Sequence, residues 1–235
     1  GRMIVRGTML DRIIAGDMPD GWVDAGLAAL DEWIAIHEAL ANDGQNVLTE
    51  LFRDHQETGF GYWEHFPADD AHDPRSGARF YYHAHDPSEW SRQEHGHFHL
   101  FLPSENEAGF SHVVAISMSP EGLPQRLFTT NEWVTGERLA PAAELLDRLP
   151  EGFEINRARP SWLVGRWLTA LVALVMPQVE SLLRARDEVL TGSEGGWPSS
   201  TVVDDRSRHV LSESELDMQE VIAAWTGYAA ELGQP

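Results

Sequence analysis

The chain has 235 residues and a formal net charge of −21, because 38 Asp and Glu residues outnumber 17 Lys and Arg residues. This charge, with no basic cluster in the sequence, excludes an extended phosphate-binding surface, so we expect no nucleic-acid partner and no binding to an anionic membrane. The chain contains no cysteine, which excludes disulfides, thiolate metal sites and cysteine nucleophiles. Any metal ion must therefore be held by nitrogen and oxygen ligands.

The length and the apolar content predict one folded domain covering residues 1–235. Hydrophobic residues make up 42% of the chain, which is enough to form a core at this length. The strongly apolar run 167–176 is too short to span a bilayer, and no secretory signal is visible near the start. We therefore expect a cytoplasmic protein that acts on a small molecule, and the sequence leaves open whether it forms a homodimer.

Helical patterns open and close the chain. Residues 8–58 form the predicted N-terminal helical layer, because apolar residues recur there at helical spacing. Residues 134–235 form the predicted C-terminal layer. In that layer we expect a long helix over 160–190, interrupted at Pro177, and a last helix over 212–232 whose Ser-Glu-Ser-Glu start fits a capping pattern.

Residues 59–133, between these layers, are typical of an antiparallel meander. Short runs rich in aromatic and β-branched residues alternate with segments rich in Pro, Gly, Ser and Asn. The polar stretch 68–77 reads as a loop. The predicted strands are 79–85, 95–102, 112–118 and 127–130. The predicted fold class is therefore α+β, with a central antiparallel β-meander of about four or more strands flanked by N- and C-terminal helices.

Five of the eleven histidines fall in two of these strands and alternate with other residues. Alternate side chains of a strand project to the same face, so the first strand presents Tyr81, His83 and His85 together. By the same rule the second strand presents three histidines on one face, namely His95, His97 and His99. The opposite face is apolar and should pack against the long helix; it comprises Phe80, Tyr82, Phe98 and Leu100.

A hairpin through the loop 86–94 would bring the histidines of both strands onto one surface. A symmetric register pairs His85 with His95, His83 with His97 and Tyr81 with His99, and directly opposed Cβ atoms lie about 4.5 to 5.5 Å apart. Neutral imidazole is a good ligand for iron, zinc and copper. The sequence therefore predicts one transition-metal ion, with iron favoured over zinc or copper, whose ligands are His83, His85, His95 and His97.

Three neighbouring side chains are candidates for catalysis. Glu94 precedes the second strand and is placed to orient a ligand or to act as an acid or base. His99 is either a fifth ligand or a nearby base, and Tyr81 offers a phenol that can bind substrate or donate a proton. His112, at the start of the third predicted strand, is a reserve ligand, and the sequence does not decide between it and His99.

These residues support several functions, of which non-heme iron oxygen chemistry on a small molecule is the leading hypothesis. A zinc-dependent hydrolase with Glu94 as the base for a bound water is one alternative, and a non-catalytic metal-binding protein is another. Residues 95–101, His-Gly-His-Phe-His-Leu-Phe, resemble the histidine-triad motif, which implies a metal-free nucleotide hydrolase or transferase with His97 as nucleophile. The paired strands also resemble cupins, in which a His-x-His pair and a further His hold a metal inside a small β-barrel.

Overall fold

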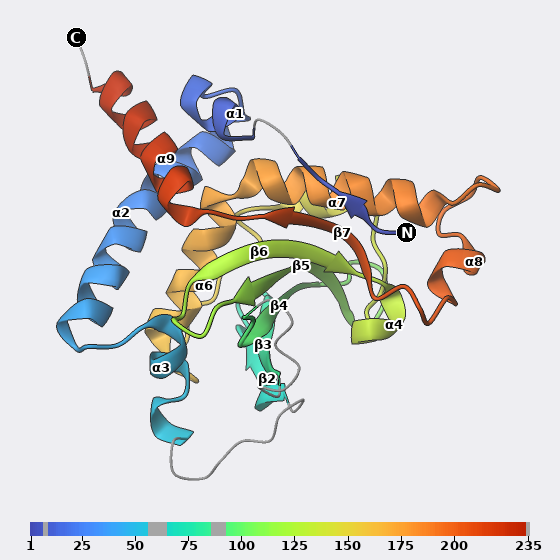
Figure 1. Cartoon of the computed structure of the whole chain (residues 1–235), viewed down its shortest axis with the longest axis horizontal. Coiled ribbons are helices and arrows are strands. Elements are labelled where there is room, and N and C mark those ends of the chain that lie inside the picture. Colours follow the sequence, from blue (N-terminus) through green and yellow to red (C-terminus); the bar gives the residue numbers. More distant parts are fainter. Residues whose placement is uncertain (7–8, 56–64, 86–92, 234–235) are drawn as a thin grey trace.

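The structure is a computed structural model, and it describes residues 1–6, 9–55, 65–85 and 93–233. Within these residues, seven strands form one sheet in the order β1, β7, β6, β5, β4, β3, β2 (Figure 1). The strands are β1 Met3–Ile4, β2 His65–His72, β3 Arg79–Ala84, β4 Gly96–Pro103, β5 Phe110–Met118, β6 Pro124–Thr130 and β7 Val210–Glu215. The helices are α1 Met9–Ala15, α2 Asp20–Asn42, α3 Val47–Leu51, α4 Glu132–Thr135, α5 Ala142–Arg148, α6 Trp162–Leu174, α7 Met176–Thr191, α8 Ser200–Val203 and α9 Met218–Leu232, and a 3-10 turn, η1, covers Arg53–His55.

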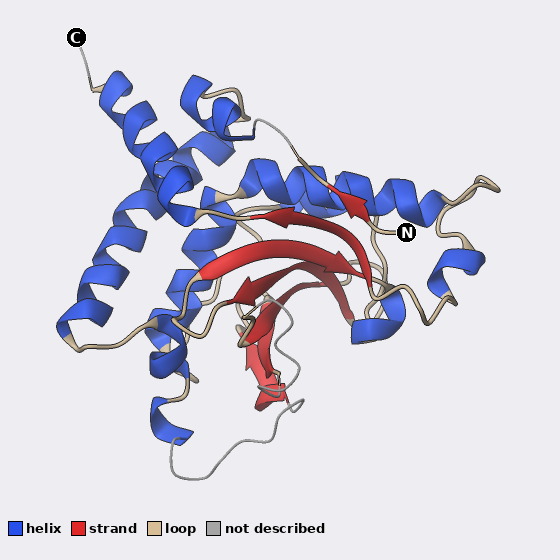
Figure 2. Cartoon of the chain, in the orientation of Figure 1, coloured by secondary structure: helices blue, strands red, loops and turns tan. Residues whose placement is uncertain are grey.

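The predicted α+β fold is confirmed. Strands β2 to β6 pair antiparallel in chain order, β7 joins β6 antiparallel, and β1 pairs with β7 in parallel. Helix α7 packs on β7, while α2 packs on α6 and α1 packs on α9. Figure 2 shows helices along one side of the curved sheet and at both of its ends. The meander is therefore flanked by helices from both ends of the chain.

The core lies between the sheet and the helix α6. The apolar face of the β3–β4 hairpin is fully buried, and Tyr82 packs edge-on against Phe98 with ring centroids 4.7 Å apart. The ring centroid of Trp167, in α6, lies 5.9 Å from that of Phe98, on the apolar face of the hairpin. The prediction that the long helix packs on this face is confirmed.

The predicted interruption of the long helix is also confirmed. Helix α6 ends at Leu174, α7 begins at Met176, and Pro177 occupies the first turn of α7, where a missing backbone N–H is tolerated. The two helices are bent by 75° with respect to each other. In the described part of the chain no single helix is long and apolar enough to cross a membrane, although this bent pair passes a test of length and composition.

The prediction of a helix beginning at residue 212 is wrong. Residues 210–215 form β7 because serine and glutamate alternate with the period of a strand. The Ser212 hydroxyl donates to the Leu182 carbonyl of α7 at 2.8 Å, whereas Glu213 projects to the other face. The last helix begins at Met218 and is capped by the Asp217 carboxylate, which accepts from the backbone N–H groups of the first turn.

The prediction that residues 68–77 form a loop is wrong in its first half. Residues 65–72 form the edge strand β2, which pairs His65 with His83 and Ala71 with Phe80. The register shifts between Phe66 and Ala71, so the ladder carries an irregularity where the acidic residues lie. The chain turns only after this strand, where the Gly77 N–H donates to the Asp73 carbonyl at 2.7 Å.

The packing of α2 against α9 makes a prediction about glycine. Gly26 of α2 faces the fully buried Trp225 of α9, and a Cβ at Gly26 would lie 2.0 Å from the indole ring. The Trp225 ring is held by a hydrogen bond from Nε1 to the Leu174 carbonyl at 2.9 Å, so it cannot move aside easily. We expect Gly26→Ala to lower the free energy of unfolding by about 1 to 3 kcal/mol, measured by urea unfolding.

Gly21 in the same helix provides the matched control. A Cβ there meets no atom within 4 Å, so Gly21→Ala should be neutral or stabilising by up to about 1 kcal/mol. Equal effects of the two substitutions would contradict the close packing of α2 on α9.

Candidate metal centre

The β3–β4 hairpin has the predicted register. His83 pairs with His97 and Tyr81 pairs with His99, while the His85 backbone N–H donates to the His95 carbonyl at 2.9 Å. The connection through residues 86–92 lies outside the described residues. The antiparallel pairing therefore brings the histidines of β3 and β4 together on the face of the sheet opposite to Trp167.

Three side chains at one end of this face converge on one point: His85, Glu94 and His97. Their potential ligand atoms all lie within 4.8 Å of one another. The Nδ1 atoms of His85 and His97 lie 3.2 and 3.3 Å from the same Glu94 oxygen, Oε1. Two ligand atoms about 2.1 Å from a metal ion and at right angles are about 3.0 Å apart, so the donors fit one ion with little movement.

Glu94 is held in place through its second oxygen. The Ser117 hydroxyl donates to Oε2, and Arg126 Nη2 donates to it at 3.1 Å. Burial alone would raise the pKa of Glu94. The hydrogen bond and the charge of His97, together with the contacts of Ser117 and Arg126, outweigh burial and lower this pKa to about 2. The carboxylate is therefore ionised at neutral pH and presents Oε1 to the two imidazoles.

Arg126 belongs to a row of alternating charges across the sheet. Its Nη1 donates to Glu213 of β7 at 2.8 Å, and Arg2 lies 3.1 Å from the other Glu213 oxygen. The Arg126 guanidinium also stacks over the Phe128 ring at 4.4 Å. These contacts fix Arg126, and Arg126 in turn fixes the orientation of Glu94.

His97 lies at the centre of the histidine face. Burial lowers the pKa of its ring below the ordinary value, against the raising effect of Glu94, so the ring is neutral at pH 7 and able to bind a metal ion. The ring of His83 lies 5.7 Å from that of His97 and 6.3 Å from that of His85. His83 thus borders the three-residue cluster without belonging to it.

The prediction that His95 shares the histidine face is wrong. Its Nδ1 is hydrogen-bonded at 2.9 Å to the hydroxyl of Tyr82, which belongs to the apolar face. His95 precedes β4, so the alternation of the strand does not yet constrain it. The cluster contains Glu94 where the sequence predicts His95. Strand periodicity does not predict this difference, because both residues precede β4.

His99 lies deeper, and its ring contacts both His97 of the cluster and His112, with ring centroids 4.7 and 5.1 Å away. Its Nδ1 lies 2.9 Å from His112 Nε2, and both side chains are buried. Ala115 of β5 pairs with His99, so regular alternation along β5 would turn His112 to the opposite face. A register shift instead pairs His112 with Phe101 and places His112 on the histidine face. This bulge explains why the sequence did not predict the pair.

A buried carboxyl group adjoins this pair. The His112 backbone N–H donates to Glu137 Oε2 at 2.7 Å. Burial, with the nearby charge of Arg186, lowers the pKa of His112 to about 3, and burial raises the pKa of Glu137 to about 8. Both groups are therefore largely uncharged at neutral pH.

Tyr81 is held between two imidazole rings. The ring of His65, from β2, stacks on it with centroids 3.8 Å apart, and the ring of His99 lies 5.0 Å away. Burial raises the pKa of Tyr81 well above its ordinary value, so the hydroxyl keeps its proton. His65 was not among the predicted site residues, because the strand β2 that carries it was not predicted.

One comparison with known proteins places the chain in a family. The family described as a domain of unknown function, DUF6969, matches residues 27–216. The chain belongs to this family. No curated protein and no solved structure matches the chain. The DUF6969 match runs from within α2 to the end of β7, so it contains the whole histidine face and all three residues of the cluster formed by His85, Glu94 and His97.

The buried carboxyl group of the DUF6969 domain makes a prediction about pH. The Glu137 pKa is raised from 4.5 to about 8 on folding. The folded state therefore favours the protonated acid, and its contribution to the free energy of unfolding is fully present below about pH 4.5 and is lost as the pH rises through 8. Glu137→Gln removes this titration. The free energy of unfolding of the variant, relative to the wild type, should therefore increase between pH 5 and pH 9, as measured by urea unfolding.

The same substitution at the exposed Glu151 is the control, and its effect should be the same at both pH values. If the effect of Glu137→Gln were also independent of pH, Glu137 would not be the buried neutral acid described above.

Proposed function

We propose that the protein is a metal-dependent enzyme that carries out non-heme iron oxygen chemistry on a small molecule. One ferrous ion would be held by His85, Glu94 and His97. The observation that carries the proposal is this donor set, two imidazole nitrogens and one carboxylate oxygen that face one another. Two histidines and one carboxylate with open coordination positions are typical of non-heme iron oxygenases.

The charge states of the cluster support binding of a divalent cation. Glu94 is ionised and His97 is neutral at pH 7, which are the forms that bind metal. Arg126 and Ser117 occupy Glu94 Oε2, so Oε1 is the oxygen offered to the ion. The supporting contacts orient the ligand before the ion arrives, as outer partners of metal ligands commonly do.

The two histidines of the proposed centre are partly exposed. The side chains of His85 and His97 keep 15% and 13% of their surface exposed. With three protein ligands, a bound ferrous ion would have open positions and would bind and activate dioxygen, while the organic substrate would supply the remaining electrons and be oxidised. Tyr81, which keeps its proton, is the proposed hydrogen-bond donor to substrate. Burial lowers the pKa of His99 well below its ordinary value, so this neutral ring is a weak proton acceptor.

The position of Glu94 argues against a zinc-dependent hydrolase in which Glu94 is the base. The hydrolytic alternative needs Glu94 as the base that takes a proton from bound water. Both oxygens of Glu94 are already engaged, Oε1 by the two imidazoles and Oε2 by Ser117 and Arg126. A carboxylate with a pKa of about 2 is also a weak base at neutral pH. Glu94 is therefore better suited to bind the ion than to abstract a proton.

Metal titration tests the proposal. Protein purified without a nickel column and stripped by a chelator should bind about one ferrous ion per chain under anaerobic conditions. His85→Ala or His97→Ala should each weaken this binding by about 100-fold or more, because loss of a ligand exceeds the 10- to 100-fold effect of losing an outer partner. His209→Ala is the control, since this ring packs against Trp133, and it should leave binding unchanged.

Other metal contents would decide between the alternatives. Stoichiometric zinc with hydrolytic activity would favour the hydrolase. A protein that never binds metal but binds nucleotides would favour His97 as a nucleophile of the histidine-triad kind. Full iron binding by the double variant His85→Ala with His97→Ala would contradict the proposed centre.

A further inference from the structure

A cleft of about 1,360 Å³ lies beside the edge strand β2. Its walls come from β2, from α3 and the turn that follows it, and from residues 156–163, which lead into α6. The cleft is not lined by His85, Glu94 or His97. Its volume exceeds the 300 to 1,000 Å³ typical of small-molecule sites, so the cleft can admit an organic ligand.

Two arginines line this cleft. Arg157 and Arg159 are exposed, and neither forms an ion pair within the described part of the chain. The cleft therefore offers two guanidinium groups to an incoming anion, and guanidinium matches the geometry of carboxylate and phosphate.

One of the three acidic side chains of the lining is paired with an arginine. Glu50 lies 3.4 Å from Arg53 and accepts a hydrogen bond from the Ser161 hydroxyl at 3.0 Å. Asp70 lies 3.6 Å from His65. Apart from the Glu50–Arg53 pair, the lining therefore holds two carboxylates, Asp54 and Asp70, and two guanidinium groups, Arg157 and Arg159.

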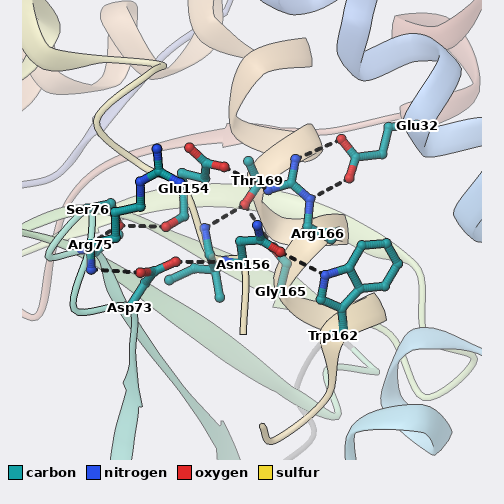
Figure 3. Close-up of polar contacts among 12 residues, drawn as sticks. Glu32, Asp73, Arg75, Ser76, Glu154, Asn156, Trp162, Gly165, Arg166 and Thr169 are labelled. Atoms are coloured by element: carbon teal, nitrogen blue, oxygen red, sulfur yellow. Dashed lines mark hydrogen bonds and ion pairs between the residues drawn. The ribbon is translucent and has the colours of Figure 1, made fainter. Parts of the chain in front are cut away.

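An aromatic ring stands at the same cleft. Trp162 is 51% exposed, which is unusual for so large a side chain. Its indole Nε1 donates to the Asn156 side-chain oxygen at 2.8 Å, as Figure 3 shows. The ring is therefore held in one orientation while its surface remains open, which suits stacking on a planar ligand.

The segment that carries these groups is tied down on both sides. The Asn156 N–H donates to Asp73 Oδ2 at 2.8 Å, and the Ser76 hydroxyl donates to the Glu154 carbonyl at 2.6 Å (Figure 3). On the other side the Ile155 N–H donates to the Thr169 hydroxyl of α6 at 2.9 Å. A wall fixed in advance loses less conformational entropy when a ligand binds.

We propose that this cleft binds a small organic anion that carries a planar ring. Arg157 and Arg159 bind the anionic group, and Trp162 stacks on the ring. An aromatic carboxylate and a nucleoside monophosphate share this chemistry, so the experiment uses one of each. The site is independent of the metal centre, because the two share no residue.

Isothermal titration of the full chain with 2-naphthoate, adenosine monophosphate and inorganic phosphate tests this proposal. At least one of the two ring-containing probes should bind, more tightly than phosphate and more weakly as salt is added. The double variant Arg157→Gln with Arg159→Gln should weaken that binding by about tenfold or more, since it removes two charge-assisted contacts. Trp162→Leu should weaken binding of the ring probe while leaving phosphate unaffected.

The matched control is Arg184→Gln with Arg206→Gln, which changes the net charge equally at two arginines that do not line the cleft. It should preserve binding. The proposal is overturned if neither ring probe binds, if the two double variants weaken binding equally, or if phosphate binds as tightly as the ring probes. Binding of only one ring probe supports the site and identifies its anionic group. Iron content is measured in the same samples and should not change.

Discussion

The register between β3 and β4 determines what each face of the hairpin carries. A slip of one residue in either strand would turn its histidines to the helices and expose its aromatic side chains. The buried contact between Tyr82 and Phe98, with Trp167 packed against them, resists such a slip because it would remove large apolar side chains from the core. The core packing on one face thus sets the positions of His83 and His97 on the other.

A second constraint comes from the distant end of the sheet. Glu94 is buried, and a buried carboxylate is unstable unless charged or polar groups satisfy it. Arg126 supplies one such group, and Glu213 of β7 holds Arg126. Residues more than a hundred positions apart in sequence therefore cooperate to orient one carboxylate. We expect the geometry of the candidate centre to depend on β6 and β7 as much as on the hairpin.

Sequence periodicity predicted much of this arrangement. The alternation of histidine with aromatic residues gave the strands, their faces and the pairing of His83 with His97, because each property follows from the period of a strand. Prediction failed where regular alternation ends. His95 lies just before β4, and His112 lies next to a bulge in β5, so neither obeys the rule.

Other features had no local signal in the sequence. The role of Glu94 depends on Arg126 and Ser117, which belong to other strands. β2 escaped prediction because its irregular pairing and polar residues look like a loop, and Ser212 to Glu215 matched a helix cap as well as a strand. The cleft combines β2 with residues 156–163, more than eighty positions away, which only the fold brings together.

The most direct test of the account is anomalous diffraction at the iron absorption edge, from crystals loaded with ferrous ion without oxygen. We expect one iron peak per chain, about 2.0 to 2.2 Å from a ring nitrogen of His85, a ring nitrogen of His97 and a carboxylate oxygen of Glu94. A peak between His99 and His112 instead, or no peak on the histidine face, would contradict it.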